Sequence, residues 1–68
     1  MGNLKLIIYS NLNEIKLFEM NITKEILNEY DINVNNENFT ELFETEILND
    51  IFEEENINSS EVYYELIK

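Results

Sequence analysis

The sequence predicts a small single α+β domain over residues 1–68, in which an amino-terminal β-hairpin is followed by two or three helices. Three observations predict this class. The chain opens with a β-branched and aromatic run, apolar residues later recur at helical spacing, and capping residues precede those later runs. A hydrophobic fraction of 44% suffices for a core, although a domain of this length buries only about 60% of its unfolded surface and is marginally stable.

The first predicted element is the hairpin. Residues 4–9 partly alternate as in a strand, residues 10–14 are typical of a turn, and residues 15–20 are expected to return as the second strand. The alternative for the returning segment is a helix capped at Asn11, with several apolar residues on one face. Those residues are Leu12, Ile15, Phe18 and Ile22. The hairpin is the favoured interpretation.

Two helices are expected in the middle of the chain. Thr23 suits the N-cap of a short first helix. Residues 31–38 are rich in asparagine and are expected to connect the two helices. The second, longer helix is expected to begin at Asn38, because Asn38 and Glu41 match a capping box.

An apolar stripe is predicted along this longer helix. Its members recur every four residues and are Phe39, Phe43, Ile47 and Ile51. On a regular helix Leu42, Leu48 and Phe52 fall outside the stripe, so the helix is apolar over a wide arc. Either the helix is buried on two sides, or part of its apolar surface serves a partner.

The last segment fits two structures. Residues 58–61 match a capping box, and the apolar residues that follow recur at helical spacing, so a helix over residues 61–67 is favoured. The same residues also alternate as in a strand, with Val62, Tyr64 and Leu66 on one face. The strand stays as the alternative.

Acidic residues gather in the second half of the sequence. Ten of the fifteen carboxylates lie in residues 37–68, where Lys68 is the only lysine, so this half carries −9 of the net charge of −11. Residues 1–36 are nearly balanced at −2. Such clustering disfavours a compact state through self-repulsion, which suggests that the charge serves a cationic partner. The candidate partner-binding residues are Glu37, Glu41, Glu44, Glu46, Asp50, Glu53, Glu54, Glu55 and Glu61.

On a helix seven of these acids are expected to form two rows, one of Glu37, Glu41, Glu44 and Glu55 and the other of Glu46, Asp50 and Glu53. Residues three or four apart lie about 5–6 Å apart at their Cβ atoms, a spacing of the same order as that between phosphates of one DNA strand. Two rows of carboxylates beside an apolar stripe could therefore imitate a DNA backbone in a basic groove. The competing interpretation is a solvated face that keeps the chain soluble. Residues 53–55 favour the mimic, since acids at the carboxyl end of a helix oppose its dipole, which suggests another use for them; codon bias is the alternative explanation of their presence.

Residue types exclude several function classes. The chain has no cysteine and no histidine, which argues against disulfides, zinc and histidine-based acid–base catalysis. Its four lysines, without any arginine, cannot line a cationic groove for direct nucleic-acid binding. With Gly2 as the only glycine, no phosphate-cradling loop is available. The sequence therefore predicts a protein that is not an enzyme and needs no cofactor.

A partial calcium motif lies in the asparagine-rich connection. Residues 31–36 match the start of an EF-hand loop, but Asn36 replaces its glycine and Leu42 stands where its bidentate glutamate belongs. We therefore expect a polar connection here and no metal site.

In composition the whole chain resembles the small acidic inhibitors that phages deploy against host defence, such as anti-CRISPR proteins, antirestriction proteins and uracil-DNA glycosylase inhibitors. No family motif accompanies the resemblance, so it assigns no residue a role. It implies an α+β monomer or homodimer that blocks a basic nucleic-acid-binding protein, a nuclease or a polymerase, without a cofactor. A CRISPR effector nuclease is the first expected target.

An interaction subunit is the alternative function. Such an adaptor of a bacterial or phage complex would bind through apolar surface, for which Leu48, Phe52 and Tyr64 are candidates. The expected location is the cytoplasm of a bacterium or of a phage-infected cell, because the apolar run at residues 6–9 is too short for a signal peptide. No apolar run approaches the roughly 18–20 residues of a membrane span, so no membrane partner is expected.

Overall fold

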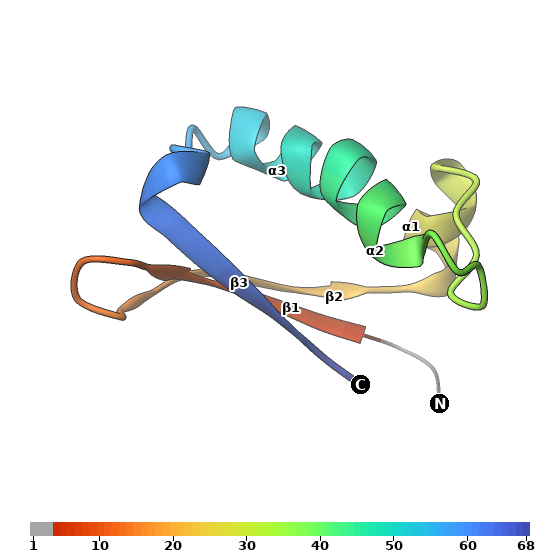
Figure 1. Cartoon of the computed structure of the whole chain (residues 1–68), viewed down its shortest axis with the longest axis horizontal. Coiled ribbons are helices and arrows are strands. Elements are labelled where there is room, and N and C mark those ends of the chain that lie inside the picture. The colour runs from red at the N-terminus through yellow and green to blue at the C-terminus, as the bar shows by residue number, and fades with distance from the viewer. Residues whose placement is uncertain (1–3) are drawn as a thin grey trace. The chain divides into compact units, whose positions relative to one another are not determined.

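A computed structural model describes residues 4–68 of the chain, and its fold belongs to the α+β class. Strand β1 (Leu4–Ser10) and strand β2 (Lys16–Ile22) form an antiparallel hairpin. The helix considered for the returning segment is therefore wrong. The hairpin is also not a separate element, because it belongs to a three-stranded antiparallel sheet in which β1 lies between β2 and β3 (Val62–Ile67) (Figure 1).

The turn between β1 and β2 is held by local hydrogen bonds. The Ser10 amide donates to the Ile15 carbonyl at 2.9 Å, and the Glu14 amide donates to the Ser10 carbonyl at 2.9 Å. Glu14 has φ of 58°, a left-handed conformation that costs a side-chain-bearing residue some energy. The pairing of the two strands shifts between Ile8 and Tyr9 of β1. Ile8 lies opposite Phe18 and Tyr9 lies opposite Lys16, so Leu17 of β2 has no partner in β1. This irregularity is a β-bulge, which increases local twist.

The helix predicted over residues 61–67 is wrong, because residues 62–67 form strand β3. Asn58 does cap a helical turn, since its side-chain oxygen accepts a hydrogen bond from the Ser60 amide at 3.1 Å. The turn, η2 (Ser59–Glu61), is a 3₁₀ helix and ends at once. The following residues instead pair antiparallel with β1, from Ser10 opposite Val62 to Lys5 opposite Ile67. The alternating pattern therefore outweighed the cap, because β1 offered a whole strand of backbone partners.

The remaining elements are helical. Helix α1 (Lys24–Glu29) follows Thr23, as predicted. A second, continuous helix consists of α2 (Phe39–Leu42), η1 (Phe43–Leu48) and α3 (Asn49–Glu54) (Figure 1). Asn38 precedes it as predicted, but its side chain makes no capping hydrogen bond, so the expected capping box does not form. Within residues 4–68 there are thus one short α-helix and one main helix, and apart from the 3₁₀ turn η2 no further helix follows them.

Two helices end in the same capping arrangement. At the end of α1, Asp31 is left-handed, and the amides of Asp31 and Ile32 donate to the carbonyls of Asn28 and Leu27. At the end of α3, Asn56 is left-handed, and the Ile57 amide donates to the Phe52 carbonyl at 2.8 Å. This bond pattern is a Schellman motif. Asp and Asn tolerate the left-handed conformation better than most residues, which explains their use in a chain with one glycine.

The middle segment of the main helix, η1, is a π-helix with i→i+5 hydrogen bonding. In a regular α-helix four residues turn through about 400°, so a stripe of residues spaced by four drifts about 40° around the axis at each step. A turn of more than four residues cancels much of this drift. Phe43, Ile47 and Ile51 are accordingly all buried.

The wider turn also corrects the sequence prediction for Leu48. On a regular helix Leu48 would lie outside the stripe. In η1 the residues four and five positions after Phe43, Ile47 and Leu48, both come above it, and Leu48 is only 4% exposed. Leu48 is therefore part of the core.

The described chain divides into two units. The sheet unit comprises residues 4–24 and 58–68, and the helical unit comprises residues 25–57. The buried apolar residues of the sheet unit are Leu4, Leu6, Ile7, Ile8 and Ile22. Those of the helical unit are Leu27, Ile32, Phe43, Ile47, Leu48 and Ile51.

Candidate interaction surface

The division into two units is also a division of charge. All four lysines of the sequence belong to the sheet unit, where four acids balance them; these acids are Glu14, Glu19, Glu61 and Glu65. The helical unit contains eleven acids and no lysine. The full net charge of −11 therefore resides in residues 25–57, and the sheet unit is neutral.

Eight of the nine candidate partner-binding residues lie in the helical unit, and all nine are exposed. Glu37 lies in the turn before the main helix, and Glu55 is the residue at which that helix ends. The helix itself carries six of the candidates: Glu41, Glu44, Glu46, Asp50, Glu53 and Glu54. Glu61 is the exception, since it belongs to η2 in the sheet unit.

Three further acids belong to the helical unit and were missed by the sequence analysis. Glu25 and Glu29 lie in α1, and Asp31 ends that helix; all three are exposed. Counting charge by halves of the sequence placed these acids with Lys5, Lys16 and Lys24, which belong to the other unit. The sequence did hold a signal for them, because no lysine lies between Lys24 and Lys68, and the three acids fall inside that lysine-free stretch.

The π segment changes how the acids of the main helix are arranged. The two predicted rows assume about 100° of rotation per residue throughout. Because η1 has a wider turn, acids after it, such as Asp50 and Glu53, are rotated relative to acids before it, such as Glu41. The exposed acids of the main helix, here called the acidic band, therefore do not form the two straight rows that a regular helix would give.

One acid of the band is anchored within the helical unit. The Tyr30 hydroxyl donates a hydrogen bond of 2.8 Å to Oδ2 of Asp50. This bond, followed in size by desolvation, raises the pKa of Tyr30 to about 12. The contact joins the end of α1 to α3 and fixes the direction of one carboxylate in the band.

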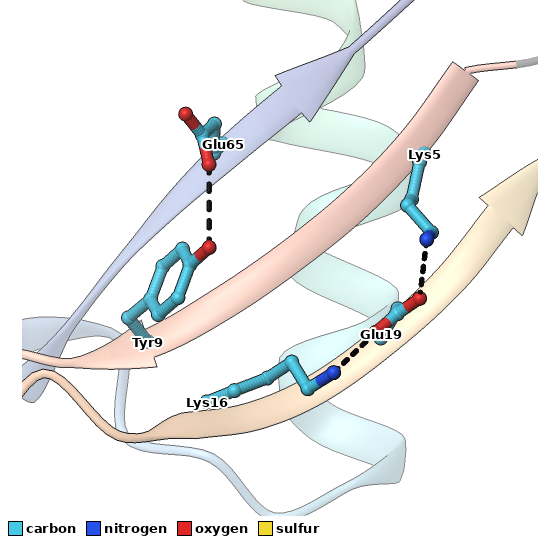
Figure 2. A network of polar contacts seen from close by, with 5 residues as sticks. All are labelled: Lys5, Tyr9, Lys16, Glu19 and Glu65. Atoms are coloured by element: carbon cyan, nitrogen blue, oxygen red, sulfur yellow. Dashed lines mark hydrogen bonds and ion pairs between the residues drawn. The ribbon is translucent and has the colours of Figure 1, made fainter.

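In the sheet unit the ion pairs converge on one residue. Glu19 accepts from the Nζ atoms of Lys16 at 2.6 Å and of Lys5 at 2.8 Å (Figure 2). These hydrogen bonds, Lys16 first, lower the pKa of the Glu19 carboxyl from 4.5 to about 2. Lys5 and Lys16, two of the four lysines, therefore form ion pairs with an acid of their own unit.

The partial calcium motif serves the backbone instead. Asp31 is the left-handed residue that ends α1, and the side-chain oxygen of Asn33 accepts a hydrogen bond from the Asn35 amide at 2.9 Å. The side-chain oxygen of Asn36 likewise accepts from the Asn38 amide at 2.8 Å. Within residues 4–68, no three His, Cys, Asp or Glu side chains come together in a way that could hold a metal ion.

The apolar surface expected for an adaptor is reduced in the structure. Leu48 is buried, and Phe52 and Tyr64 are half-buried. The large apolar side chains that are exposed lie elsewhere. They are Leu12, Ile15, Leu17, Val34, Tyr63 and Ile67, of which all but Val34 belong to the sheet unit.

No helix in the part of the chain that the structure describes is both long enough and apolar enough to cross a membrane. Comparison with known proteins found no matching family model, no matching curated protein and no matching solved structure.

Proposed function

We propose that this protein is a non-catalytic inhibitor of a nucleic-acid-binding enzyme, and that the carboxylates of its helical unit take the place of DNA phosphates. The observation that carries the proposal is the confinement of the entire net charge to residues 25–57. Solubility alone does not require such segregation, because acids spread over both units would provide it equally well. Binding to a cationic groove of a partner would explain why the acids are gathered in one unit.

The position of the acids on the main helix supports the same proposal. Glu53 and Glu54 occupy the last turn, Glu55 follows, and no basic residue lies in that turn. Each acid there costs a few tenths to about 1 kcal/mol, because the carboxyl end of a helix is already negative. Docked beside lysines and arginines of a groove, the helix dipole and the carboxylates would attract the partner together.

The target class follows from the chemistry of the surface. A groove that binds DNA is lined by Lys and Arg and is built to accept a dense row of anions. We take a guide-loaded CRISPR effector nuclease as the first candidate target, with other nucleases and polymerases as further members of the class. The protein itself would contribute neither a cofactor nor a reacting group, and its location would be the cytoplasm where such enzymes work.

The adaptor is the alternative within this proposal. It would bind through apolar surface, and the burial of Leu48 leaves the main helix with little of it. The two functions differ in salt dependence. Inhibition through carboxylates weakens steeply with salt, whereas apolar binding tolerates it.

The test is a DNA-binding and cleavage assay on a panel of guide-loaded CRISPR effector nucleases. We expect the protein to block DNA binding by at least one of them and to lose inhibition between about 50 and 200 mM salt. Glu53→Lys combined with Glu54→Lys is expected to weaken inhibition at least tenfold, about 1.4 kcal/mol. The fold should persist, since lysine suits that end of a helix.

A matched control carries the same change of net charge in the neutral unit. Glu14→Lys combined with Glu65→Lys should retain most of the inhibition if the helical unit makes the contact. Equal loss in both double variants would show that only bulk charge matters. Absence of inhibition across the panel would reject the CRISPR target, and inhibition insensitive to salt would favour the adaptor.

A further inference from the structure

The sheet has one face that is exposed and carries charges of both signs. The strand register places Ile7 and Tyr9 of β1 on this face, beside Glu19 of β2 and Glu65 of β3. The other side chains of this face, the outer face, are Lys5, Lys16, Asn21, Tyr63 and Ile67. The opposite face of the same strands holds fully buried residues such as Leu6 and Ile8.

Apolar groups on the outer face remain accessible. Tyr63 is 43% exposed and Ile67 is 42% exposed. Tyr63 stacks on Tyr9 with ring centroids 5.2 Å apart, which holds both rings in place. Ile7 lies between them and Lys5 along the central strand but is buried, with 8% of its surface exposed. The accessible apolar surface of the outer face is therefore that of Tyr63 and Ile67, with the half-buried Tyr9 stacked on Tyr63, and charged groups surround it.

The charges divide the outer face into two halves. On the β2 side, Lys5 and Lys16 bind Glu19, which leaves a net charge of +1 (Figure 2). On the β3 side, Glu65 accepts a hydrogen bond from the Tyr9 hydroxyl at 3.3 Å and contributes −1 (Figure 2). The face as a whole is neutral and carries a dipole across its strands.

We propose that the outer face binds the outer face of a second copy of this chain. A two-fold axis parallel to β1 sets the β2 half of each copy against the β3 half of the other, so that +1 meets −1 twice. A two-fold axis across the strands would set like halves together. A strongly charged partner gains nothing from a neutral face, whereas this face complements itself. This inference goes beyond the proposed function and does not depend on it.

The size of the face sets the strength of the contact. Three strands spaced by about 4.8 Å, with six or seven residues rising about 3.4 Å each, give a face of roughly 15 by 20 Å. About 300 Å² per copy, or about 600 Å² in total, is less than the roughly 1,200–2,000 Å² that stable interfaces bury and is of the size of weak, transient contacts. Repulsion between the two −11 charges opposes the contact and is screened by salt. The dimer is therefore expected to be weak and to strengthen with salt.

Sedimentation equilibrium tests the proposal with purified protein up to about 1 mM, at about 0.15 M and 0.5 M salt. We expect a reversible dimer whose dissociation constant falls at the higher salt. Tyr63→Ser combined with Ile67→Ser should weaken dimerisation at least tenfold. Leu12→Ser is the matched control, because Leu12 is 86% exposed but lies in the turn beyond the strands. A monomer under all conditions, or equal weakening by Leu12→Ser, would overturn the proposal.

A charge exchange tests the orientation. Glu65→Lys makes the molecule less negative, so general repulsion predicts stronger association, whereas the proposed contact predicts weaker association, at least tenfold. Lys16→Glu should also weaken the dimer, and Lys16→Glu with Glu65→Lys should restore it. Circular dichroism confirms that each variant is folded, and Glu65→Gln replaces Glu65→Lys if the latter is not. Stronger association of the Glu65 variant, or failure of the double variant to recover, would overturn the two-fold arrangement.

Discussion

Glu19 is the residue whose environment differs most from that of the other acids. Lysines at 2.6 and 2.8 Å keep its carboxyl ionised and lower its pKa to about 2. Because the folded state holds the proton less tightly than the unfolded state, this group stabilises the fold fully above about pH 4.5. The contribution is lost as pH falls toward about 2. The side chain is exposed, so solvent screens the effect.

Glu19→Gln is therefore expected to lower the melting temperature at neutral pH. The difference from the parent should shrink below about pH 4.5 and disappear as the pH falls through about 2, where the parent carboxyl takes up its proton too. Thermal unfolding of both proteins, followed by circular dichroism from neutral pH to about pH 2, measures the difference in melting temperature. Glu14→Gln removes one charge from the same unit without touching the lysine pair, and it is the control for the loss of a negative charge alone. A constant difference down to pH 2 would contradict the assignment.

Asp50 belongs to the acidic band and also makes a hydrogen bond within its own unit. Its carboxylate is exposed within the acidic band and also accepts the Tyr30 hydrogen bond of 2.8 Å. The bond raises the pKa of Tyr30 to about 12 and therefore stabilises the fold up to about pH 10, with loss between pH 10 and 12. A residue of the proposed contact surface thus also joins two helices of its unit.

At the scale of elements, the π segment decides which face of the main helix is buried. Its wide turn keeps the apolar residues spaced by four in line and brings Leu48 into the core. Such segments are rare and short, and they are frequent at functional sites. Here the segment also sets the rotation between the acids at the two ends of the helix.

Leu48→Ala is expected to lower the free energy of unfolding by about 2–5 kcal/mol, the usual cost of truncating a buried leucine. Urea unfolding monitored by tyrosine fluorescence gives the value. Leu12→Ala is the matched control, since Leu12 is 86% exposed, and its effect should stay within about 0.5 kcal/mol. If the two substitutions cost the same, Leu48 lies on the surface and the regular helix is the better description.

At the scale of the whole molecule, charge segregation governs stability. Eleven acids without a lysine in one unit repel one another over the distance that salt allows. The Debye length falls from about 30 Å at 0.01 M to about 8 Å at 0.15 M. Salt should therefore relieve the repulsion within the helical unit more than it weakens the ion pairs of the sheet unit.

The melting temperature is accordingly expected to rise between about 0.01 and 0.15 M salt. Glu53→Lys combined with Glu54→Lys removes two acids of the helical unit and adds two lysines, so the same increase in salt should raise its melting temperature less. Differential scanning calorimetry of both proteins at the two salt concentrations makes the comparison. A flat or falling melting temperature in the parent would show that the acids do not repel one another appreciably in the folded state.

The elements whose signals are local could be predicted from the sequence. The strand at β1, the start of α1 after Thr23 and the start of the main helix after Asn38 were predicted from residue types within a few positions, although the capping box expected at Asn38 does not form. Helical hydrogen bonds are equally local. The net charge and the exposed acids of the main helix were also predictable, because composition fixes the first and polar spacing the second.

The fold of the last segment depends on contacts between segments that are far apart in the sequence. Residues 62–67 carry both patterns, and they become a strand because β1, more than fifty positions earlier, supplies their backbone partners. Local signals cannot report a partner so distant. The same pairing adds β3 and Lys68 to the unit that holds the other three lysines, and that unit is then neutral. The acidic stretch 25–57 is contiguous in the sequence, and strand pairing makes it a separate unit because it joins the segments on either side of it.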